Sequence, residues 1–381
     1  MTDAKGFRNT RRATKLNLFH TSPGSTAMQE VLADWQPVVD EAIETLLPRT
    51  IDAEYLESYF GAPAHQYDTA AIQGALSDPV WELLDRGGKR WRAIVCLLLL
   101  DGFGADPHEY LEYACIPEIL HNGTIIVDDV EDGASMRRGG PALHQLYGVD
   151  VALNAGNAMY FLPLKVIAHN PAGLNPATQL SLYDMFMVEL NRTHLGQGMD
   201  ICWHNRPEHS ITEAHYLEMC ACKTGCLGRM VARIAAILTD QSDSVEHAAA
   251  EYAEHMSIAF QIGDDILDVE HTLDQAGDFG KAFGNDIREG KKTLMVIHAM
   301  NECPADDAAR LTEILRTKDN TETEILEAIK IIQSVDGLEY ARDRALAFAA
   351  AARNHLNKLP ITDERHAQLE AFTEFVIDRD T

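Results

Sequence analysis

Positive charge is scarce in this chain. Its 381 residues include 32 Lys and Arg against 59 Asp and Glu, only 11 of the cations are Lys, and the formal net charge is −27. A nucleic-acid-binding protein needs a basic face, so this balance argues against that class. An anionic substrate would be repelled at long range, so any anion site must be locally basic or filled with metal ions. The acidity fits either an ordinary acidic cytosolic protein or a surface adapted to high salt.

A membrane-spanning run and a disulfide framework are also missing. The longest apolar run, residues 93–100, ends at Asp101 and is far shorter than the ~20 residues that cross a bilayer. No signal peptide is visible, so we expect a cytoplasmic protein without a transmembrane segment. Four of the seven cysteines cluster without a CxxC pair, at Cys202, Cys220, Cys222 and Cys226. This spacing favours buried reduced thiols over a zinc site.

Strand-like alternation is scarce, whereas helical periodicity is nearly continuous. From Met28 onward apolar residues recur three and four positions apart, and Gly and Pro cluster at plausible helix breaks. We therefore predict an all-α fold of about a dozen helices. Residues 1–26 lack a helical period and are expected to form a loose N-terminal extension, with residues 27–381 as a single helical domain.

One five-residue pattern occurs twice, about 136 residues apart. DDVED at residues 128–132 follows one apolar helical segment, and DDILD at residues 264–268 follows another. Residues four apart share a helix face, so Asp128 points the same way as Asp132, and Asp264 the same way as Asp268. Like charges at this spacing destabilise a helix by roughly a few tenths of a kcal/mol. A cation between them is therefore expected.

Magnesium suits these ligands. Mg²⁺ prefers hard oxygen donors, keeps several waters, and is usually held by one or two carboxylates plus substrate phosphates. A lone cluster in an acidic chain would more simply be a solvated helix face. Two clusters, each within apolar sequence, instead favour a metal site. The candidate ligands are Asp128, Asp129, Asp132, Asp264, Asp265 and Asp268.

Basic residues stand beside Gly-rich turns at four places. They are GGKRWR at 87–92, Arg137 and Arg138 before Gly139, Lys223 in KTG, and Lys281 after Gly280. Backbone N–H groups at such turns and Arg forks both suit phosphate oxygens. Each alone would more simply be a surface ion pair. Together they supply the local positive charge that an anion site in an acidic chain requires.

Six motifs, in order, resemble those of the trans-type isoprenyl diphosphate synthases. They are GGKRWR at 87–92, HNGTIIVDDVEDGASMRRG at 121–139, GQGMD at 196–200, KTG at 223–225, FQIGDDILD at 260–268 and GKAFGNDIREGKKT at 280–293. The residues within these motifs are most similar to those of geranylgeranyl diphosphate synthases. One departure is Ala93, where the family often has Pro. The resemblance implies helices around a central cavity, usually in a homodimer, with the two Asp-rich helices facing each other across its mouth.

The resemblance also implies roles for individual residues. Asp128 and Asp132 would share two Mg²⁺ with the allylic diphosphate, and Asp264 would hold a third, supported by Asp265 and Asp268. Contacts to the allylic diphosphate are expected from Arg137, Lys223 and Lys281. Isopentenyl diphosphate would be bound by Lys89, Arg92, His121 and Arg138, with Arg90 in the same motif. The dipoles of Thr224 and Gln261 would face the allylic cation.

The implied activity is prenyl transfer, the head-to-tail condensation of isopentenyl diphosphate with an allylic diphosphate. Mg²⁺ and cationic side chains would stabilise the departing diphosphate. The C=C bond would then attack the allylic cation inside a cavity shielded from water. No side-chain nucleophile with a triad-like partner stands out. A class I terpene synthase would not need the second aspartate cluster or both Arg137 and Arg138, and a non-catalytic regulatory subunit would tend to lose such residues.

Product length should follow cavity depth. Gly123 and Thr124, just before the first cluster, are small and would not stop the growing chain. Tyr160, Phe161 and His194 match floor residues of eukaryote-type geranylgeranyl diphosphate synthases, so we expect a C20 product. If Tyr160 and Phe161 are ordinary core aromatics, a C25 or longer product is the main competitor.

Overall fold

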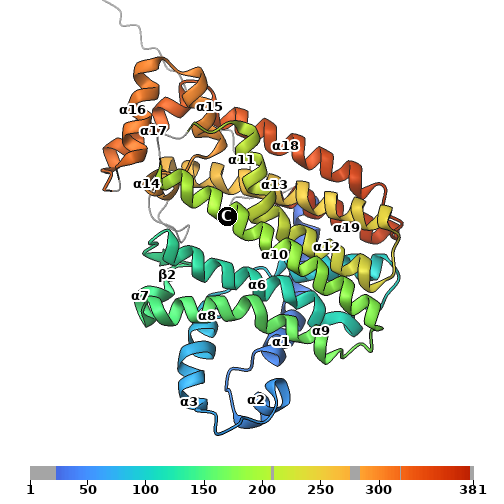
Figure 1. The fold of residues 1–381 in the computed structure, drawn as a ribbon. Coiled ribbons are helices and arrows are strands. Elements are labelled where there is room, and N and C mark those ends of the chain that lie inside the picture. The colour runs from blue at the N-terminus through green and yellow to red at the C-terminus, as the bar shows by residue number, and fades with distance from the viewer. Residues whose placement is uncertain (1–22, 207–209, 275–283, 318, 378–381) are drawn as a thin grey trace, which may run out of the picture.

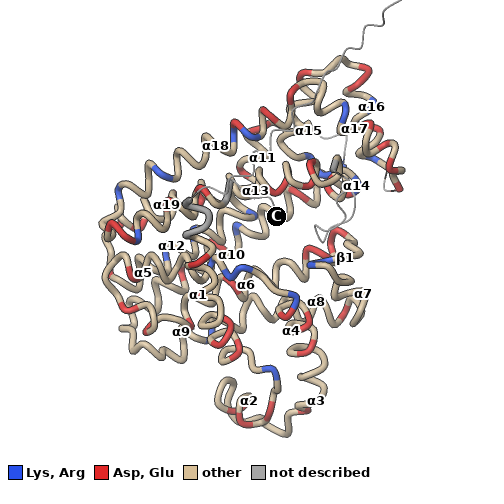
Figure 2. The backbone as a smooth tube through the Cα atoms, turned by 180° about the vertical axis from the view of Figure 1, so that it is seen from behind, with Lys and Arg blue, Asp and Glu red and all other residues tan. Residues whose placement is uncertain are grey.

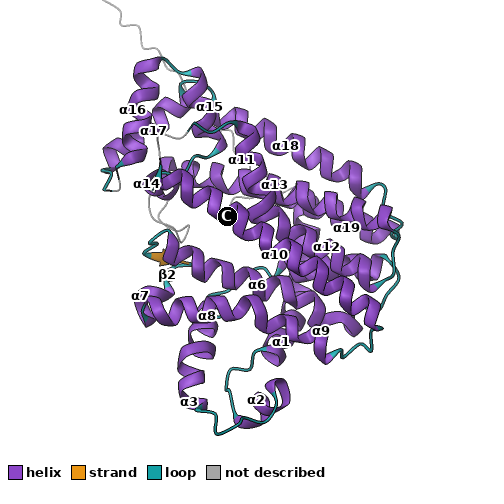
Figure 3. Ribbon diagram, viewed as in Figure 1, coloured by secondary structure: helices purple, strands orange, loops and turns teal. Residues whose placement is uncertain are grey.

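The polypeptide folds almost entirely into α-helices (Figures 1 and 3). A computed structural model describes residues 23–206, 210–274, 284–317 and 319–377. Within these residues the only sheet is a two-stranded antiparallel hairpin, in which β1 (Met136–Arg137) pairs with β2 (Gly140–Pro141). The predicted all-α class is confirmed.

Nineteen α-helical segments make up most of the described chain. In chain order they are α1 (Pro23–Leu46), α2 (Ala53–Phe60), α3 (Thr69–Ile72), α4 (Asp78–Leu84), α5 (Trp91–Gly102), α6 (Leu111–Glu131), α7 (Leu143–Tyr147), α8 (Val149–Phe161), α9 (Lys165–His169), α10 (Pro176–Asn205), α11 (Glu213–Cys220), α12 (Cys226–Leu238), α13 (Asp243–Asp274), α14 (Asn285–Glu289), α15 (Leu294–Glu302), α16 (Ala305–Arg316), α17 (Glu322–Gln333), α18 (Gly337–Leu356) and α19 (Asp363–Ile377).

Several neighbouring helices are continuous. The π-helical turns η1 (Gln73–Ser77) and η4 (Ala221–Gly225) and the 3₁₀ turn η3 (Leu162–Leu164) join the helices on either side, whereas the 3₁₀ turn η2 (Pro107–Tyr110) leads into α6. Counting joined segments once leaves about sixteen helices in the described chain. This exceeds the predicted dozen because short helices such as α7 and α14 have too few residues to show a periodic pattern.

The first helix starts earlier than the apolar period indicated. α1 begins at Pro23, and proline is favoured in the first helical turn because its fixed φ fits and its missing N–H needs no partner there. Residues 1–22 of the expected N-terminal extension lie outside the described part of the chain.

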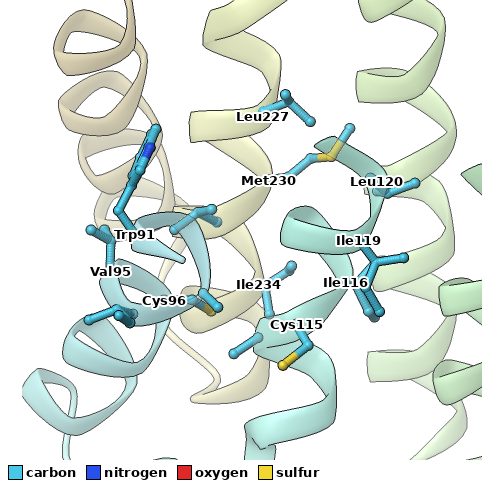
Figure 4. Close-up of a cluster of buried hydrophobic side chains, with 14 of the residues drawn as sticks. Trp91, Val95, Cys96, Cys115, Ile116, Ile119, Leu120, Leu227, Met230 and Ile234 are labelled. Carbon is cyan, nitrogen blue, oxygen red and sulfur yellow. The ribbon is translucent and has the colours of Figure 1, made fainter. Parts of the chain in front are cut away.

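The long apolar run belongs to a core helix. Residues 93–100 of α5 are each no more than 2% exposed, as expected for a helix that is apolar on all sides. Figure 4 shows where this packing occurs, with Trp91, Val95 and Cys96 of α5 beside Cys115, Ile116, Ile119 and Leu120 of α6 and Leu227, Met230 and Ile234 of α12. This core fixes α6, whose far end holds the first aspartate cluster.

A second core lies under the C-terminal helices, where α18 packs lengthwise against α13 (Figure 1). Buried alanines at positions 341, 345, 349 and 352 follow one face of α18. Small residues three and four positions apart let the two helix backbones approach closely. The packing holds α13, which carries the second aspartate cluster.

Among the described residues, one stretch of helix, Val149–His169, passes a length and composition test for crossing a membrane. Its most apolar window has a mean hydropathy of 1.2, and half of that window is buried inside the fold. The core helix of a soluble protein passes the same test, so the stretch is weak evidence for a membrane span.

The seven cysteines are free thiols, and five of them, Cys96, Cys115, Cys220, Cys222 and Cys226, are buried. The prediction of buried reduced thiols holds for Cys220, Cys222 and Cys226, whereas Cys202 is free but only half-buried. Figure 2 shows Asp and Glu distributed over most helices, with fewer Lys and Arg between them. Adaptation of this surface to salt stays a prediction.

Candidate active site

The first aspartate cluster forms the last turn of α6. The helix ends where Gly133 adopts a left-handed backbone with φ 66°, and the N–H of Ala134 donates to the carbonyl of Asp129 at 2.9 Å. Asp128 and Asp132 therefore lie one turn apart at a helix C-terminus, the negative end of the helix dipole. Two carboxylates at this position require cations beside them.

Two lysines supply positive charge at this point. Lys223 Nζ lies 3.1 Å from Asp128 Oδ1 and 2.7 Å from Asp200 Oδ2, and Lys291 Nζ lies 3.1 Å from Asp132 Oδ2. Burial opposes ionisation of Asp128, but Lys223 and Lys291 hold the pKa of this carboxyl below its ordinary value. Burial raises the pKa of Asp132 to about 7 against the attraction of Lys291. Asp128 is therefore ionised more readily than Asp132.

Asp129 is paired with Arg137, which also lies 3.8 Å from Asp128 Oδ2. The Asp129 side chain is 2% exposed, and its Oδ1 accepts a 2.7 Å hydrogen bond from Nε of Arg137. Arg137 lies in β1 and lines the cavity described below. Asp129 is thus placed to position Arg137, whereas the sequence had suggested it as a metal ligand.

In the second cluster, Asp264 and Asp265 line the cavity, while Asp268 is turned into the wall. Asp264 borders the same cavity as Asp128, from within α13. Asp268 is 3% exposed, and its Oδ2 accepts the backbone N–H of Asp286 at 3.2 Å. Asp264 is therefore the member of this cluster best placed to hold a metal ion, and Asp268 supports the wall.

A chain of hydrogen bonds joins η4 to α13. The hydroxyl of Thr224 donates to Gln261 Oε1 at 2.9 Å, Gln261 Nε2 donates to Asp265 Oδ1 at 2.9 Å, and the Tyr216 hydroxyl donates to Asp265 Oδ2 at 2.7 Å. Asp265 therefore orients the Gln261 amide. Turns of π-helix are frequent at functional sites, and this one places both Lys223 and Thr224 along the cavity.

The GQGMD segment of α10 contacts both η4 and α6 and fixes their relative position. A Cβ on Gly196 would lie 2.4 Å from the backbone nitrogen of Lys223, so this close approach of helix to turn requires glycine. One turn further, Asp200 accepts the Lys223 ammonium, and Gln197 Nε2 donates to Asp128 Oδ1 at 2.8 Å. The segment therefore sets the position of Lys223 beside the first cluster.

A buried carboxylate stands among the cations of the GGKRWR segment. Glu118 is 3% exposed, and its Oε1 lies 4.0 Å from Arg90 Nη1. Burial lowers the pKa of Arg92 to about 10 and that of Arg138 to about 10, while Glu118 raises both. Burial, followed by Arg92, lowers the pKa of His121 well below its ordinary value, so its ring is neutral at pH 7. The group retains excess positive charge, as an anion site needs.

Polar atoms in this group lack partners within the described residues. Arg92 Nε, His121 Nδ1 and Glu118 Oε2 are buried without a hydrogen bond. Such atoms cost free energy unless a ligand or water satisfies them. Arg90 Nη1 is also buried without a hydrogen bond, but its Nε donates to Asp40 Oδ1 at 2.7 Å and its Nη2 donates to the carbonyl of Leu84 at 3.1 Å. Its observed bonds are structural.

All these walls enclose one cavity of about 550 Å³. The predicted residues that line it are Lys89, Arg90, Arg92, His121, Thr124, Asp128, Arg137, Arg138, Tyr160, His194, Lys223, Thr224, Gln261, Asp264 and Asp265. Lys89 reaches across to α19, with Nζ 4.9 Å from the centre of the Phe375 ring. Cationic side chains are concentrated in this cavity, so it can bind an anion although the protein as a whole is acidic. Lys281 lies outside the described residues.

The donor atoms fit Mg²⁺. Asp128, Asp132 and Asp264 offer only carboxylate oxygens, the ligands that Mg²⁺ prefers. Asp132 does not itself line the cavity, but its partner Lys291 does. Lysine ammonium groups lie beside both Asp128 and Asp132, so positive charge is accommodated next to both carboxylates. These three aspartates are the residues that would hold the metal.

The expected floor is only partly formed by the predicted residues. Tyr160 is 7% exposed and lines the cavity, with its ring 5.6 Å from that of His194. Phe161 does not line the cavity and is 69% exposed. Gly123 is likewise absent from the lining, because a Cβ there would lie 2.6 Å from Met159 Cβ and 2.8 Å from the carbonyl of Gly156. Its small size serves the crossing of α6 with α8.

Sequence reasoning missed Lys291 and Glu118. Lys291 is followed by Lys292 directly after Gly290, and both lysines line the cavity. Paired lysines beside glycine in a lysine-poor chain could have identified them. A single Glu in an apolar segment has no such pattern, and Glu118 became recognisable only through its position among four cations.

A profile of the polyprenyl synthetase family matches residues 73–332. Among curated proteins, a geranylgeranyl diphosphate synthase of Saccharolobus solfataricus is 30% identical over 305 residues, covering 80% of this chain and 90% of its own. A geranylfarnesyl diphosphate synthase of Natronomonas pharaonis is 29% identical over 314 residues, covering 78% and 88%. The solved geranylgeranyl pyrophosphate synthetase of Geoglobus acetivorans is 28% identical, with a TM-score of 0.76 over 92% of this chain and 100% of that one.

Proposed function

Because the chain belongs to the polyprenyl synthetase family and is a prenyltransferase, we propose that it condenses isopentenyl diphosphate with an allylic diphosphate, head to tail, to give geranylgeranyl diphosphate. The observation that carries this proposal is the single cavity in which both aspartate clusters and two groups of cations meet. Similarity to synthases named for the C20 product supports that length. The geranylfarnesyl relative makes C25 the competing product.

At the allylic end of the cavity, the residues bind and hold the leaving group. Asp128, Asp132 and Asp264 would hold Mg²⁺, three ions in our proposal, which when bound neutralises charge developing on the diphosphate. Arg137 and Lys223 offer N–H donors to the same phosphate oxygens. The fixed dipole of the Thr224 hydroxyl and the amide oxygen of Gln261 lie along the cavity where the allylic carbon becomes positive.

At the other end, the residues orient the nucleophile. Arg92, Arg138 and neutral His121 provide donors for the diphosphate of isopentenyl diphosphate, with Lys89 beside them. Its C=C bond is thereby directed at the allylic carbon, and the proton lost after bond formation goes to the released diphosphate. The apolar lining, which includes Phe260, excludes water from the cation.

A homodimer and a cytoplasmic location complete the proposal. Large apolar side chains are exposed along one face of α10, at Leu180, Met187, Val188 and Leu195, with a spacing that keeps them on one helical stripe. A second copy would cover this stripe. Sedimentation equilibrium that gives the mass of a single chain would contradict the dimer.

The activity is tested by incubating the protein with Mg²⁺, farnesyl diphosphate and labelled isopentenyl diphosphate. We expect a labelled C20 diphosphate, identified by mass, that does not form without Mg²⁺. A hydrocarbon made from farnesyl diphosphate alone would indicate a terpene synthase instead. Absence of any product from a folded protein would favour a non-catalytic subunit.

Truncation of Tyr160 should lengthen the product. Tyr160→Ala removes a buried ring from the cavity wall, so the chain should grow by one or more further C5 units, measured by mass spectrometry. Phe161→Ala is the matched control, because its exposed side chain lies outside the cavity, and its product should remain C20. A lengthened product from Phe161→Ala, or an unchanged one from Tyr160→Ala, would contradict this assignment of the floor.

Loss of Arg92 should weaken binding of one substrate selectively. Arg92→Met removes a buried guanidinium that lines the cavity, and a hydrogen bond to a charged group is worth about 1.5–3 kcal/mol. The KM for isopentenyl diphosphate should therefore rise about 10–100-fold, with little change in the KM for farnesyl diphosphate. Arg310→Met, on the surface of α16, is the control. An equal rise in both KM values would remove Arg92 from the isopentenyl diphosphate site.

A further inference from the structure

A second group of potential metal ligands lies between α13 and α18. Glu251 and His255 are one turn apart on α13, and His355 faces them from near the end of α18. A carboxylate oxygen and one nitrogen from each ring all lie within 4.8 Å of one another. Three ligands of this type from two helices are a recurrent arrangement in metal sites.

This group is separate from the aspartate cavity. His255 precedes Asp264 by nine residues of the same helix, which is about 14 Å along the axis and two and a half turns. The two side chains therefore leave α13 on opposite faces. None of the three residues lines the aspartate cavity within the described chain, and the ring of His255 stacks between helices instead, 5.8 Å from that of Phe348.

The two imidazoles are set up to offer lone pairs. His255 Nδ1 donates to the backbone carbonyl of Glu251 at 2.7 Å, which leaves Nε2 as the unprotonated nitrogen of the neutral ring. Metal-bound histidines commonly donate their other N–H to a backbone carbonyl in this way. His355 Nδ1 is buried and makes no hydrogen bond with any described residue. The rings stack at 5.3 Å with planes 19° apart, so the two imidazoles lie side by side.

Around Glu251 the surroundings favour a cation, whereas Lys358 adds positive charge on the His355 side. Glu251 also lines a second cavity, of about 570 Å³, that contains more carboxylates than guanidinium groups. Its three arginines, Arg192, Arg229 and Arg233, all pair with the fully buried Glu189. Their positive charge is therefore largely offset, and Glu251 keeps a negative environment.

We propose that Glu251, His255 and His355 bind a divalent transition metal of the zinc class, which clamps α13 to α18 and leaves a fourth position for water. Two imidazole nitrogens exclude Mg²⁺ as the preferred ion, because Mg²⁺ selects oxygen ligands. Zn²⁺ binds nitrogen and carboxylate oxygen at about 2.0–2.2 Å. Donor atoms within 4.8 Å of one another reach such a centre through small side-chain rotations.

The test measures zinc uptake by the full-length, metal-free protein. Equilibrium dialysis against Zn²⁺ is run in a large excess of Mg²⁺, which occupies the aspartate cavity, and bound zinc is counted by mass spectrometry. We expect one Zn²⁺ per chain, and a visible absorption band of tetrahedral geometry when Co²⁺ replaces it. Glu251→Gln and His355→Gln should each weaken zinc binding on the order of a hundredfold or more, because even outer partners of a metal are worth about 10–100-fold.

Two controls separate binding from folding. His366→Gln changes a half-buried histidine on α19 and should keep the zinc stoichiometry of the unchanged protein. Mg²⁺-dependent prenyl transfer reports that each variant is folded, since none of these residues lines the aspartate cavity. Zn²⁺ should raise Tm in the unchanged protein and in His366→Gln, but not in Glu251→Gln. Failure of the unchanged protein to bind zinc, or undiminished binding in both site variants, would overturn the proposal.

Discussion

Replacing Asp264 by asparagine is expected to lower kcat about a thousandfold. Asp264 borders the cavity, as Asp128 of the first cluster does, whereas the Asp268 carboxylate accepts the backbone N–H of Asp286 in the wall. Asparagine keeps its size but removes the charge that helps to hold Mg²⁺. Charge stabilisation by a metal ion is worth several kcal/mol, and each ~1.4 kcal/mol is tenfold in rate. The measurement is single-turnover formation of labelled product over a range of Mg²⁺ concentrations.

A matched variant tests whether the loss belongs to the site. Glu270→Gln lies on the same helix, about two turns from Asp264, where Glu270 pairs with Arg342 on the surface. Exposed pairs contribute little, so this enzyme should keep kcat within about twofold. Asp268→Asn should fall between the two, because an amide oxygen can still accept the Asp286 N–H. If Asp264→Asn keeps kcat within tenfold at saturating Mg²⁺, Asp264 is not a metal ligand.

Much of the fold could be predicted because helical periodicity is a local property. The apolar run at residues 93–100 and the three- and four-residue spacing beyond Met28 each indicate helix without knowledge of neighbours. The number of helices was underestimated because some interruptions between helices depend on tertiary packing, which the sequence does not show. The π-helical turn at 221–225 has no breaker of its own before Gly225, and it forms where Gly196 of α10 leaves room for it.

The site was predictable where the same acidic pattern occurs twice in the sequence. Asp128, Asp132 and Asp264 stood out because clustered acids within apolar sequence are costly. Which aspartates hold metal and which position other side chains was not predictable from the sequence. Asp129 is distinguished by its contact with Arg137, and Asp265 by its contact with Tyr216. Phe161 was misplaced for a related reason. Adjacent residues on a helix point about 100° apart, so Tyr160 can face the cavity while Phe161 points to the surface.

The position of Lys291 leads to the last prediction. Its ammonium contacts Asp132 and Glu289, at 3.1 and 2.6 Å, and those carboxylates hold its pKa well above the ordinary value despite burial. In the metal-free protein it is therefore a stand-in cation for the first cluster. Lys291→Met would leave two buried carboxylates without this partner.

Without Mg²⁺, Lys291→Met should lower the free energy of unfolding by about 3 kcal/mol, the low end for breaking a buried ion pair. Saturating Mg²⁺ should restore more stability to the variant than to the unchanged protein, because a metal ion binds the folded state and replaces the missing charge. Urea denaturation with and without Mg²⁺ measures both effects. Lys330 is exposed on α17. As a control, Lys330→Met should change the free energy of unfolding by no more than about 0.5 kcal/mol, with or without Mg²⁺. A Lys291→Met protein as stable as the unchanged one without Mg²⁺ would show that the ammonium does not neutralise the cluster.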